Sequence, residues 1–278
     1  MIEKIEDWME FRTVVDVEDP GFRIGACEEM LFVGSCFADN IGARFREEKF
    51  RATVNPFGVM YNPASILHTV EKLSSSQLST VRTVFFTLGT NHVYRLNETG
   101  KIVDNCQKRP QSLFTEEELT VDECADYLQR AIDILRQHNP DVRIVLTVSP
   151  IRYRKYGYHG SQLSKAALLL AIEKIINLQS SVCYFPAYEI VNDELRDYRF
   201  YAEDMLHPSE QAVEYIWQRL QETYLSDEAK AFLQAWAPLK AALNHKPFHP
   251  DSEEYRAFMD KTMLKVAELQ KKYPTFAI

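Results

Sequence analysis

Short apolar runs alternate along the chain with segments of helical periodicity. Runs typical of buried strands occur at 30–34, 83–89, 143–149 and 182–187, with a weaker one at 51–54. Between them apolar residues recur every three or four positions, as in Phe37, Ile41 and Phe45, and again over about 120–138 and 161–179. This alternation predicts an α/β fold with three layers (α/β/α), in which helices cover both faces of a central parallel sheet.

Two segments depart from that alternation. Residues 92–105 hold two short apolar runs on either side of Asn97-Glu98-Thr99-Gly100, which predicts a β-hairpin insertion. After residue 225 the chain becomes helical and charged, so we expect a domain over 1–224 and a helical C-terminal extension over 225–278.

The last helix is predicted over about 251–273 and is amphipathic. Its apolar stripe consists of Tyr255, Phe258, Met259, Met263, Val266 and Leu269. Such a stripe has to be covered, and Trp236, Pro238 and Leu239 just upstream can supply a facing helical surface. We therefore expect packing within the chain, with a contact between two copies as the alternative, so the protein is a monomer or a homodimer.

Net charge, cysteine spacing and the length of the apolar stretches argue against several classes of function. The chain has 278 residues, 46% of them hydrophobic, and a formal net charge of −8, which argues against nucleic-acid partners. Its five cysteines have no CxxC spacing, so we expect no disulfide framework, no metal site and no cofactor. No stretch is long enough to span a membrane, and the first eight residues lack the apolar run of a signal peptide, which predicts a cytoplasmic protein.

Two distant segments carry candidate chemistry. Ser35 follows the first apolar run, where a strand gives way to a helix, and helix-start N–H groups there can face whatever the hydroxyl attacks. About 170 residues later, Asp204 precedes His207 by three positions, a spacing that lets the carboxylate orient the imidazole. In the order Ser, Asp, His, these residues predict a hydrolase with Ser35 as nucleophile. Ser35 as a plain helix N-cap is the structural alternative.

These motifs also resemble a known family. Gly34-Ser35-Cys36-Phe37-Ala38 is similar to the signature of the GSCFA family, a branch of the SGNH/GDSL hydrolase superfamily, and Asp204-Met205-Leu206-His207 is similar to its Asp-x-x-His block. The resemblance covers roughly residues 25–224. It implies a flavodoxin-like three-layer fold and a Ser35–His207–Asp204 triad at the carboxyl edge of the sheet.

The same resemblance implies donors for the oxyanion that develops on the substrate. The backbone N–H groups of Ser35 and Gly58 and the side-chain amide of Asn91 are the candidates. Gly58 also fits a plain Pro-x-Gly turn, and Asn91 fits a coincidence of spacing. Cys36 invites a Cys–His interpretation, but we expect its side chain to point away from His207 and to pack as a small hydrophobe.

Three further residues are candidates for substrate binding. His92 follows the third strand close to the site, with an exposed hairpin face as its alternative role. Arg196 and Arg199 precede the triad loop and could hold an acidic or sugar substrate, or one of them could pair with Asp204 or Glu203. We expect Arg152, Arg154 and Lys155 to form a solvated loop.

The predicted activity is that of a serine esterase that removes a small acyl group such as acetyl, plausibly from a carbohydrate. The partner is then a small acylated substrate, with a glycan as the candidate, and neither nucleic acid nor a membrane. An O-acyltransferase acting on a glycan and a non-catalytic carbohydrate-binding protein are the alternatives, since the same triad serves the first and the same fold the second.

Overall fold

The computed structural model describes residues 11–179 and 181–276. The expectation about a signal peptide concerns residues outside this part of the chain. A five-stranded parallel sheet in the order β2-β1-β3-β7-β8 forms the centre of the fold. The strands are β1 (Glu29–Gly34), β2 (Arg51–Val54), β3 (Thr83–Leu88), β7 (Arg143–Val148) and β8 (Val182–Tyr184), which confirms the strands expected from the apolar runs.

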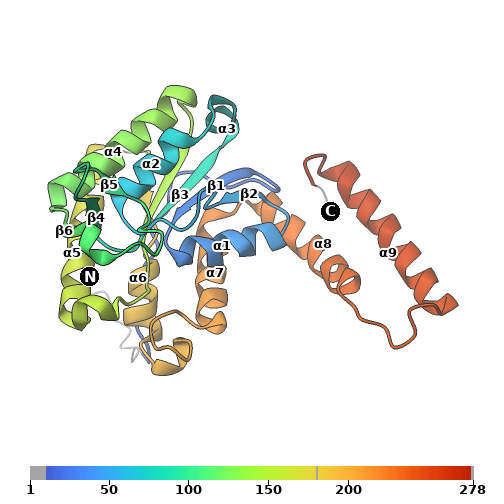
Figure 1. The fold of residues 1–278 in the computed structure, drawn as a ribbon. Coiled ribbons are helices and arrows are strands. Elements are labelled where there is room, and N and C mark those ends of the chain that lie inside the picture. The colour runs from blue at the N-terminus through green and yellow to red at the C-terminus, as the bar shows by residue number, and fades with distance from the viewer. Residues whose placement is uncertain (1–10, 180, 277–278) are drawn as a thin grey trace, which may run out of the picture.

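Helices cover both faces of this sheet, as Figure 1 shows, so the predicted three-layer class is confirmed. One face carries α2 (Pro63–Lys72), α3 (Ser75–Thr80), α4 (Val121–His138) and α5 (Gly157–Leu178). The other carries α1 (Cys36–Glu47), the short α6 (Ala187–Glu189) with the π-helical turn η3 (Ile190–Leu195), and α7 (Glu210–Tyr224). Strand residues alternate between the two cores: Leu31 and Val33 face the first, Met30 and Phe32 the second.

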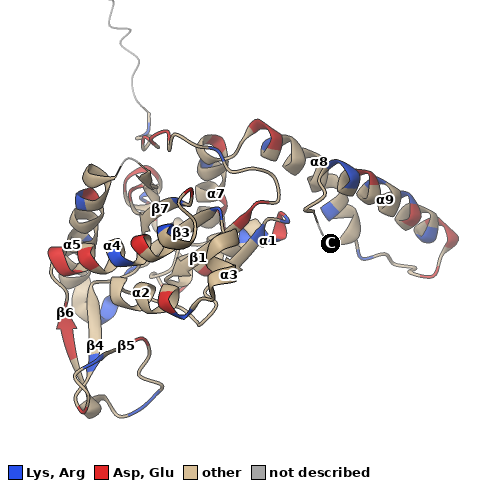
Figure 2. Cartoon of the chain, turned by 90° about the horizontal axis from the view of Figure 1, so that it is seen from above, with Lys and Arg blue, Asp and Glu red and all other residues tan. Residues whose placement is uncertain are grey.

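The insertion after β3 is larger than the predicted hairpin. β4 (His92–Leu96) pairs with β5 (Ile102–Val103), as expected, and on its other side with β6 (Phe114–Glu118). β6 reads Phe-Thr-Glu-Glu-Glu and therefore lacks the apolar alternation by which strands are predicted, and the ribbon of its acidic residues is red in Figure 2. Short 3-10 turns occur at η1 (Gln111–Leu113), η2 (Arg154–Tyr156) and η4 (Tyr198–Phe200).

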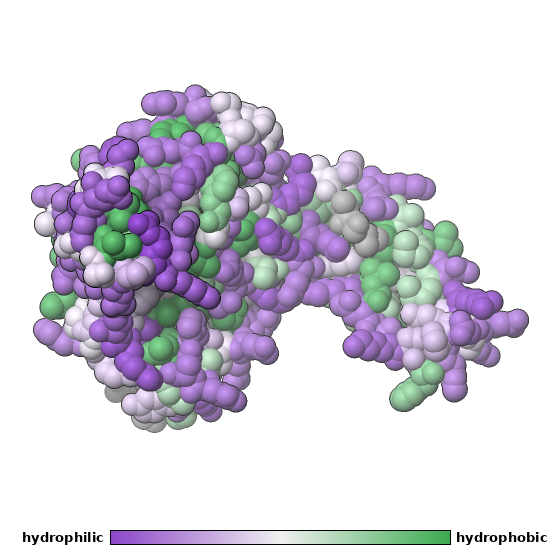
Figure 3. Space-filling model, viewed as in Figure 1, coloured by the Kyte–Doolittle hydropathy of each residue, from purple (hydrophilic) through white to green (hydrophobic). Residues whose placement is uncertain are grey.

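The C-terminal segment is a helical hairpin of α8 (Asp227–Leu243) and α9 (Glu253–Lys272) that projects from the α/β body (Figures 1 and 3). Phe232, Trp236 and Leu239 of α8 pack against Val266 and Leu269 of α9. This bears out the expected facing surface within the chain. The stripe is only partly covered, however, because Phe258 and Met263 are 42% and 47% exposed. The domain boundary at residue 224 stays a prediction.

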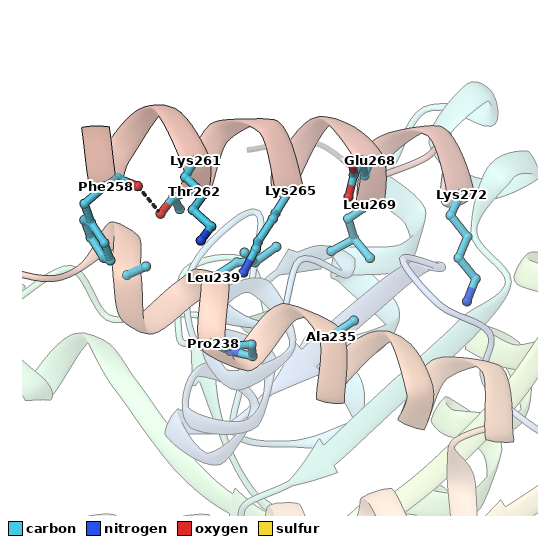
Figure 4. Close-up of a pocket in the computed structure, with 11 residues that line it drawn as sticks. Ala235, Pro238, Leu239, Phe258, Lys261, Thr262, Lys265, Glu268, Leu269 and Lys272 are labelled. Atoms are coloured by element: carbon cyan, nitrogen blue, oxygen red, sulfur yellow. Dashed lines mark hydrogen bonds between the residues drawn. The ribbon is translucent and has the colours of Figure 1, made fainter. Parts of the chain in front are cut away.

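A groove of about 540 Å³ runs between these two helices. Figure 4 shows its lining, with Pro238 and Leu239 on α8 and the lysines Lys261, Lys265 and Lys272 along α9. The hairpin is joined to the body at the end of α1, where Trp236 Nε1–H donates to the carbonyl of Glu47 at 3.2 Å.

Candidate active site

The carboxyl ends of the parallel strands meet at one edge of the sheet, and the candidate residues lie in the segments that follow them. The chain leaves β1 toward β2 on one side and returns as β3 on the other, so a topological switch point lies between β1 and β3. Ligands in open α/β sheets bind at such points. Ser35 and Cys36 follow β1, and Asn91 and His92 follow β3.

Asp204 and His207 are paired through side chain and backbone. His207 Nδ1 lies 2.5 Å from Asp204 Oδ2, and Asp204 Oδ1 accepts the backbone N–H groups of Leu206 and His207 at 2.8 and 3.0 Å. These donors, the backbone ones first, hold the pKa of Asp204 well below its usual range. The ionised carboxylate accepts the Nδ1–H of the ring, which leaves Nε2 free to accept a proton.

The Asp204–His207 loop is docked on the segment after β7. Leu206 accepts the backbone N–H of Arg152 at 3.1 Å, and the Arg154 guanidinium donates to the carbonyl of Asp204 at 3.3 Å. The loop remains accessible, since the side chains of His207 and Asp204 are 40% and 45% exposed. The two arginines predicted to form a solvated loop therefore help to hold the imidazole loop in place.

Ser35 is fully buried at the start of α1. Its Oγ accepts the N–H of Phe37 at 3.3 Å and lies 3.3 Å from Thr87 Oγ1, so it acts as the N-cap of the helix. Its N–H donates to the carbonyl of Thr87 at 3.0 Å, which extends the pairing between β1 and β3. Among the described residues, no hydrogen bond joins Ser35 to His207.

Each predicted oxyanion donor has a hydrogen-bond acceptor of its own in this structure. The N–H of Ser35 is bound to Thr87, as above. The N–H of Gly58 donates to the carbonyl of Asn55 at 2.9 Å and closes a turn in which Gly58 has a φ of 95°. The buried Asn91 amide donates to the carbonyl of Leu119 at 2.8 Å. The turn gives Gly58 a structural role, and the bond to Leu119 gives Asn91 one. For both residues the role as an oxyanion donor stays a prediction.

Cys36 packs against the core on the α1 face of the sheet, as expected of a small hydrophobe, although it is not fully buried. It is half-buried, and its Sγ lies 3.9 Å from the hydroxyl of Tyr61. Burial, and next the nearby thiol, raise the pKa of Tyr61 to about 12, so the phenol stays protonated at neutral pH. The backbone N–H of Cys36, at the first position of α1, has no acceptor in the part of the chain that the structure describes.

Tyr61 also lines a cavity of about 280 Å³, whose lining does not include Cys36. Its walls combine rings, among them Tyr61, His92, Tyr153 and Tyr156, with small apolar and polar side chains. The His92 ring stacks on that of Tyr156 with centroids 3.6 Å apart, and burial lowers the pKa of His92. The sequence had drawn attention to His92, which the structure places in the cavity wall, whereas Arg196 and Arg199 are not among the lining residues.

Sequence reasoning missed the aromatic residues of this cavity. Tyr153 and Tyr156 fall in the segment after β7, which the charges of Arg152, Arg154 and Lys155 mark as solvated. Their position after a central strand, at the edge where ligands bind, was the available signal. Among the described residues no cluster of three or more His, Cys, Asp or Glu side chains is arranged to hold a metal ion. No described helix is long and apolar enough to cross a membrane.

Comparison with known proteins shows to which family the chain belongs. The model of the GSCFA family matches residues 29–80 and 72–220, and that of the GSCFA domain protein C-terminal domain matches residues 236–278. The chain belongs to the GSCFA family. No curated protein matches it.

Solved structures with a similar arrangement share little sequence with this GSCFA protein. A family 3 carbohydrate esterase from Clostridium thermocellum is 14% identical, with a TM-score of 0.42 over 76% of this chain and 98% of that one. A carbohydrate esterase family 3 protein from Talaromyces cellulolyticus is 11% identical, with a TM-score of 0.41 over 76% and 99%. A candidate GDSL-like lipase from Parabacteroides merdae is 12% identical, with a TM-score of 0.46 over 73% and 97%.

Proposed function

We propose that this GSCFA protein is an esterase of the SGNH type that hydrolyses a small acyl ester. The observation that carries the proposal is the Asp204–His207 pair, held at 2.5 Å in a loop docked on the carboxyl edge of the sheet. An imidazole oriented by an ionised carboxylate is a general base that can also return the proton to a leaving group. Its exposure leaves that base within reach of a substrate.

The start of α1 supplies the second part of the proposed reaction. It lies at the topological switch point, and helix-start N–H groups favour the negative charge that develops on an ester oxygen during attack. The sequence predicts Ser35 as the attacking group, with Asp204 and His207 completing the triad.

The cavity lined by Tyr61, His92 and Tyr156 supports a small acyl group as the part of the substrate that is bound. Its volume of about 280 Å³ and its tyrosine walls suit an acetyl-sized group attached to an alcohol that stacks on aromatic rings. A carbohydrate is such an alcohol, because the apolar face of a sugar ring packs on aromatic side chains. His92 would contact the substrate there, whereas Arg196 and Arg199 are not among the residues that line the cavity.

Hydrolysis of 4-nitrophenyl acetate and of acetylated sugars tests the proposal. His207→Ala should lower kcat by about 10³-fold or more, and Asp204→Asn should leave a measurable residue of activity, because the ring is still present but poorly oriented. His138→Ala is the matched control, since His138 is exposed on α4, away from the site. Equal activity of wild type and His207→Ala on every ester would refute the proposal. Transfer of the acetyl group to an added sugar instead of water would identify an acyltransferase.

A further inference from the structure

A second cavity lies next to the one lined by Tyr61, His92 and Tyr156. Its volume is about 570 Å³, and its lining comes from the segment after β2, from α2 and from the insertion that holds β5. The two cavities share four lining residues, which are Val59, Val103, Asp104 and Asn105. They therefore form one continuous groove. Its larger part, the polar cavity, lies within the usual range for ligand pockets of roughly 300–1,000 Å³.

The segment after β2 lines both parts of the groove and is tied to the strand ends of the main sheet. Residues 57–60 border the polar cavity, and Tyr61 borders its neighbour. The N–H of Met60 donates to the carbonyl of Gly34 at 2.8 Å, and the carbonyl of Tyr61 accepts the N–H of Gly89 at 2.9 Å. These bonds fix the segment beside the turn between β1 and α1. A ligand that fills the groove therefore lies along the carboxyl edge of the sheet.

The polar cavity carries charged groups of both signs. Among the described residues of its lining, Lys72 and Arg109 are cations, Glu71 and Asp104 are carboxylates, and His68 is an imidazole. The two cations balance the two carboxylates, so the lining favours neither an anion nor a cation. It offers both donors and acceptors of hydrogen bonds. The hydroxyl groups of a sugar donate and accept as well, so an uncharged carbohydrate fits this lining.

The polar groups of this cavity are held in place by one another. The Asp104 side chain is 16% exposed, and its carboxylate lies 2.6 Å from His68 Nδ1 and 2.8 Å from Lys72 Nζ. Burial raises the pKa of Asp104, but the hydrogen bonds from His68 and Lys72 outweigh it and bring the pKa below its ordinary value. The Arg109 guanidinium lies over the ring of Phe114, 5.4 Å from its centroid, which leaves the N–H groups at its edge for a ligand. Groups fixed in this way lose less entropy when a ligand binds.

Each part of the groove also has an aromatic ring that is open to solvent. Phe57 lines the polar cavity and is 47% exposed. Tyr61 lines the neighbouring cavity and is 40% exposed. The apolar face of a sugar ring can pack on an aromatic side chain. The groove therefore offers one such ring to each of two consecutive sugars.

We propose that the polar cavity binds a second sugar ring, so that the substrate is an uncharged oligosaccharide chain and not an acylated monosaccharide. This inference rests on the proposed function, because it places the sugar that carries the ester in the cavity lined by Tyr61. The next sugar of the same chain then packs on Phe57. Its hydroxyl groups bond with Asp104 and Lys72.

Binding measured without turnover tests the inference. Isothermal titration calorimetry on the wild-type chain compares β-linked oligomers of glucose, of xylose and of N-acetylglucosamine, each with one, two and three rings. The affinity should rise at least about tenfold from one ring to two in one or more of these series, because only the longer ligand reaches the polar cavity. The absence of such a rise in all three series would overturn the inference.

Substitutions in the polar cavity locate the gain in affinity. Phe57→Ala should reduce the rise from one ring to two to less than about twofold, whereas Phe57→Tyr, which keeps the aromatic ring, should retain it. Asp104→Asn should also reduce the rise, because an amide does not hold His68 and Lys72 as the carboxylate does.

The matched control is Phe258→Ala, since Phe258 is an aromatic residue of α9 with a similar exposure of 42%. Melting temperatures of all four variants show whether a loss of binding reflects a loss of the fold. Phe57 is exposed, so its substitution keeps the test available even where Asp104→Asn fails to fold. A rise that persists in Phe57→Ala and in folded Asp104→Asn would place the second ring elsewhere and contradict the inference.

The outcomes separate the inference from the function on which it rests. Ester hydrolysis that is lost in His207→Ala, in a chain whose affinity does not depend on ligand length, refutes the second sugar site and leaves the esterase proposal standing. Length-dependent binding that Phe57→Ala removes, in a chain whose activity is equal in wild type and His207→Ala, supports the second sugar site and refutes the esterase.

Discussion

At the scale of single residues, two neighbours in the sequence can have different surroundings in the folded chain. Ser35 and Cys36 are neighbours in the signature, yet one completes the β1–β3 pairing and caps α1 while the other faces Tyr61. The change from strand to helix within one residue separates them. The signature therefore identifies a place in the fold, and the contacts of each side chain there follow from the structure.

The capping role of Ser35 predicts a cost in stability. Ser35→Ala removes the acceptor of the Phe37 N–H and the neighbour of the Thr87 hydroxyl, both in a buried place. Loss of an N-cap costs about 1 kcal/mol, and a buried donor left without a partner adds about 1–3 kcal/mol. Urea unfolding measures the sum. Ser226→Ala, which removes the cap of α8, is the matched control and should cost less, and an equal or smaller loss at Ser35 would contradict the buried role.

Lys165 is a buried amine that has no carboxylate partner among residues 11–179 and 181–276. Its Nζ donates to the carbonyls of Gly89 and Ser149, at the ends of β3 and β7, and burial lowers its pKa from 10.5 to about 7. Between pH 7 and pH 10.5 the amine of Lys165 is therefore protonated in the unfolded chain and neutral in the folded chain. The free energy of unfolding should therefore rise with pH across this window and be unaffected by this group below about pH 7.

Lys165→Met should remove that part of the pH dependence. The difference between wild type and variant should grow in favour of wild type from pH 7 to pH 10, by up to about 1.4 kcal/mol per pH unit. Urea unfolding at four pH values gives the curve. Lys174→Met changes an exposed lysine of the same helix and should show no such slope. Parallel curves for Lys165→Met and wild type would mean that the amine keeps its proton when buried.

At the scale of elements, the small sheet β5-β4-β6 completes the site from outside the main sheet. β6 pairs with β4 along its whole length, and Arg95 of β4 and Glu117 of β6 form a salt bridge at 3.0 Å. Lys155, from the segment after β7, contacts Glu116 at 2.8 Å. These ties hold His92, the first residue of β4, against Tyr156 in the cavity wall.

His92→Ala should weaken substrate binding more than it slows the chemistry. The substitution removes one wall of the cavity, while Ser35 and the Asp204–His207 pair remain in place. We expect KM for an acetylated sugar to rise about tenfold, with kcat changed by less than about threefold. Steady-state kinetics separates the two. A lower kcat with an unchanged KM would place His92 in the reaction and not in binding.

At the scale of the whole molecule, the α8–α9 hairpin is attached to the body by a limited set of contacts. Ala229 joins the core beneath α7, Trp236 binds Glu47 at the end of α1, and Lys240 forms a salt bridge with Glu48 at 2.9 Å. Phe232 and Trp236 are covered by α9, Tyr273 and Phe276. Coverage of α8 therefore depends on α9.

Truncation tests this arrangement in two steps. Ending the chain after Asn244 removes α9 and should expose Phe232 and Trp236, which lowers the melting temperature or causes aggregation. Ending it near residue 226 removes both helices and should leave the Asp204–His207 pair in place while it uncovers the end of α1. Melting curves and size-exclusion chromatography measure the outcome. Soluble, monomeric and equally stable truncated proteins would show that the hairpin is dispensable.

The sequence by itself determined the features that depend on local spacing. Apolar runs and helical periods predicted five strands of the sheet and the helices beside them, because burial on two faces and on one face leaves different patterns. The Asp204–His207 contact followed from an i, i+3 spacing in one short loop.

Only the tertiary structure decided which groups are free to act. The hydrogen-bond partners of Ser35, Asn91 and Lys165 come from Thr87, Leu119 and Ser149, on other elements of the fold. β6 was hidden for a similar reason, since its acidic residues form a strand only because β4 offers an edge to pair with. A donor is available for catalysis only if no neighbour has already bound it, and spacing along the chain carries no record of those neighbours.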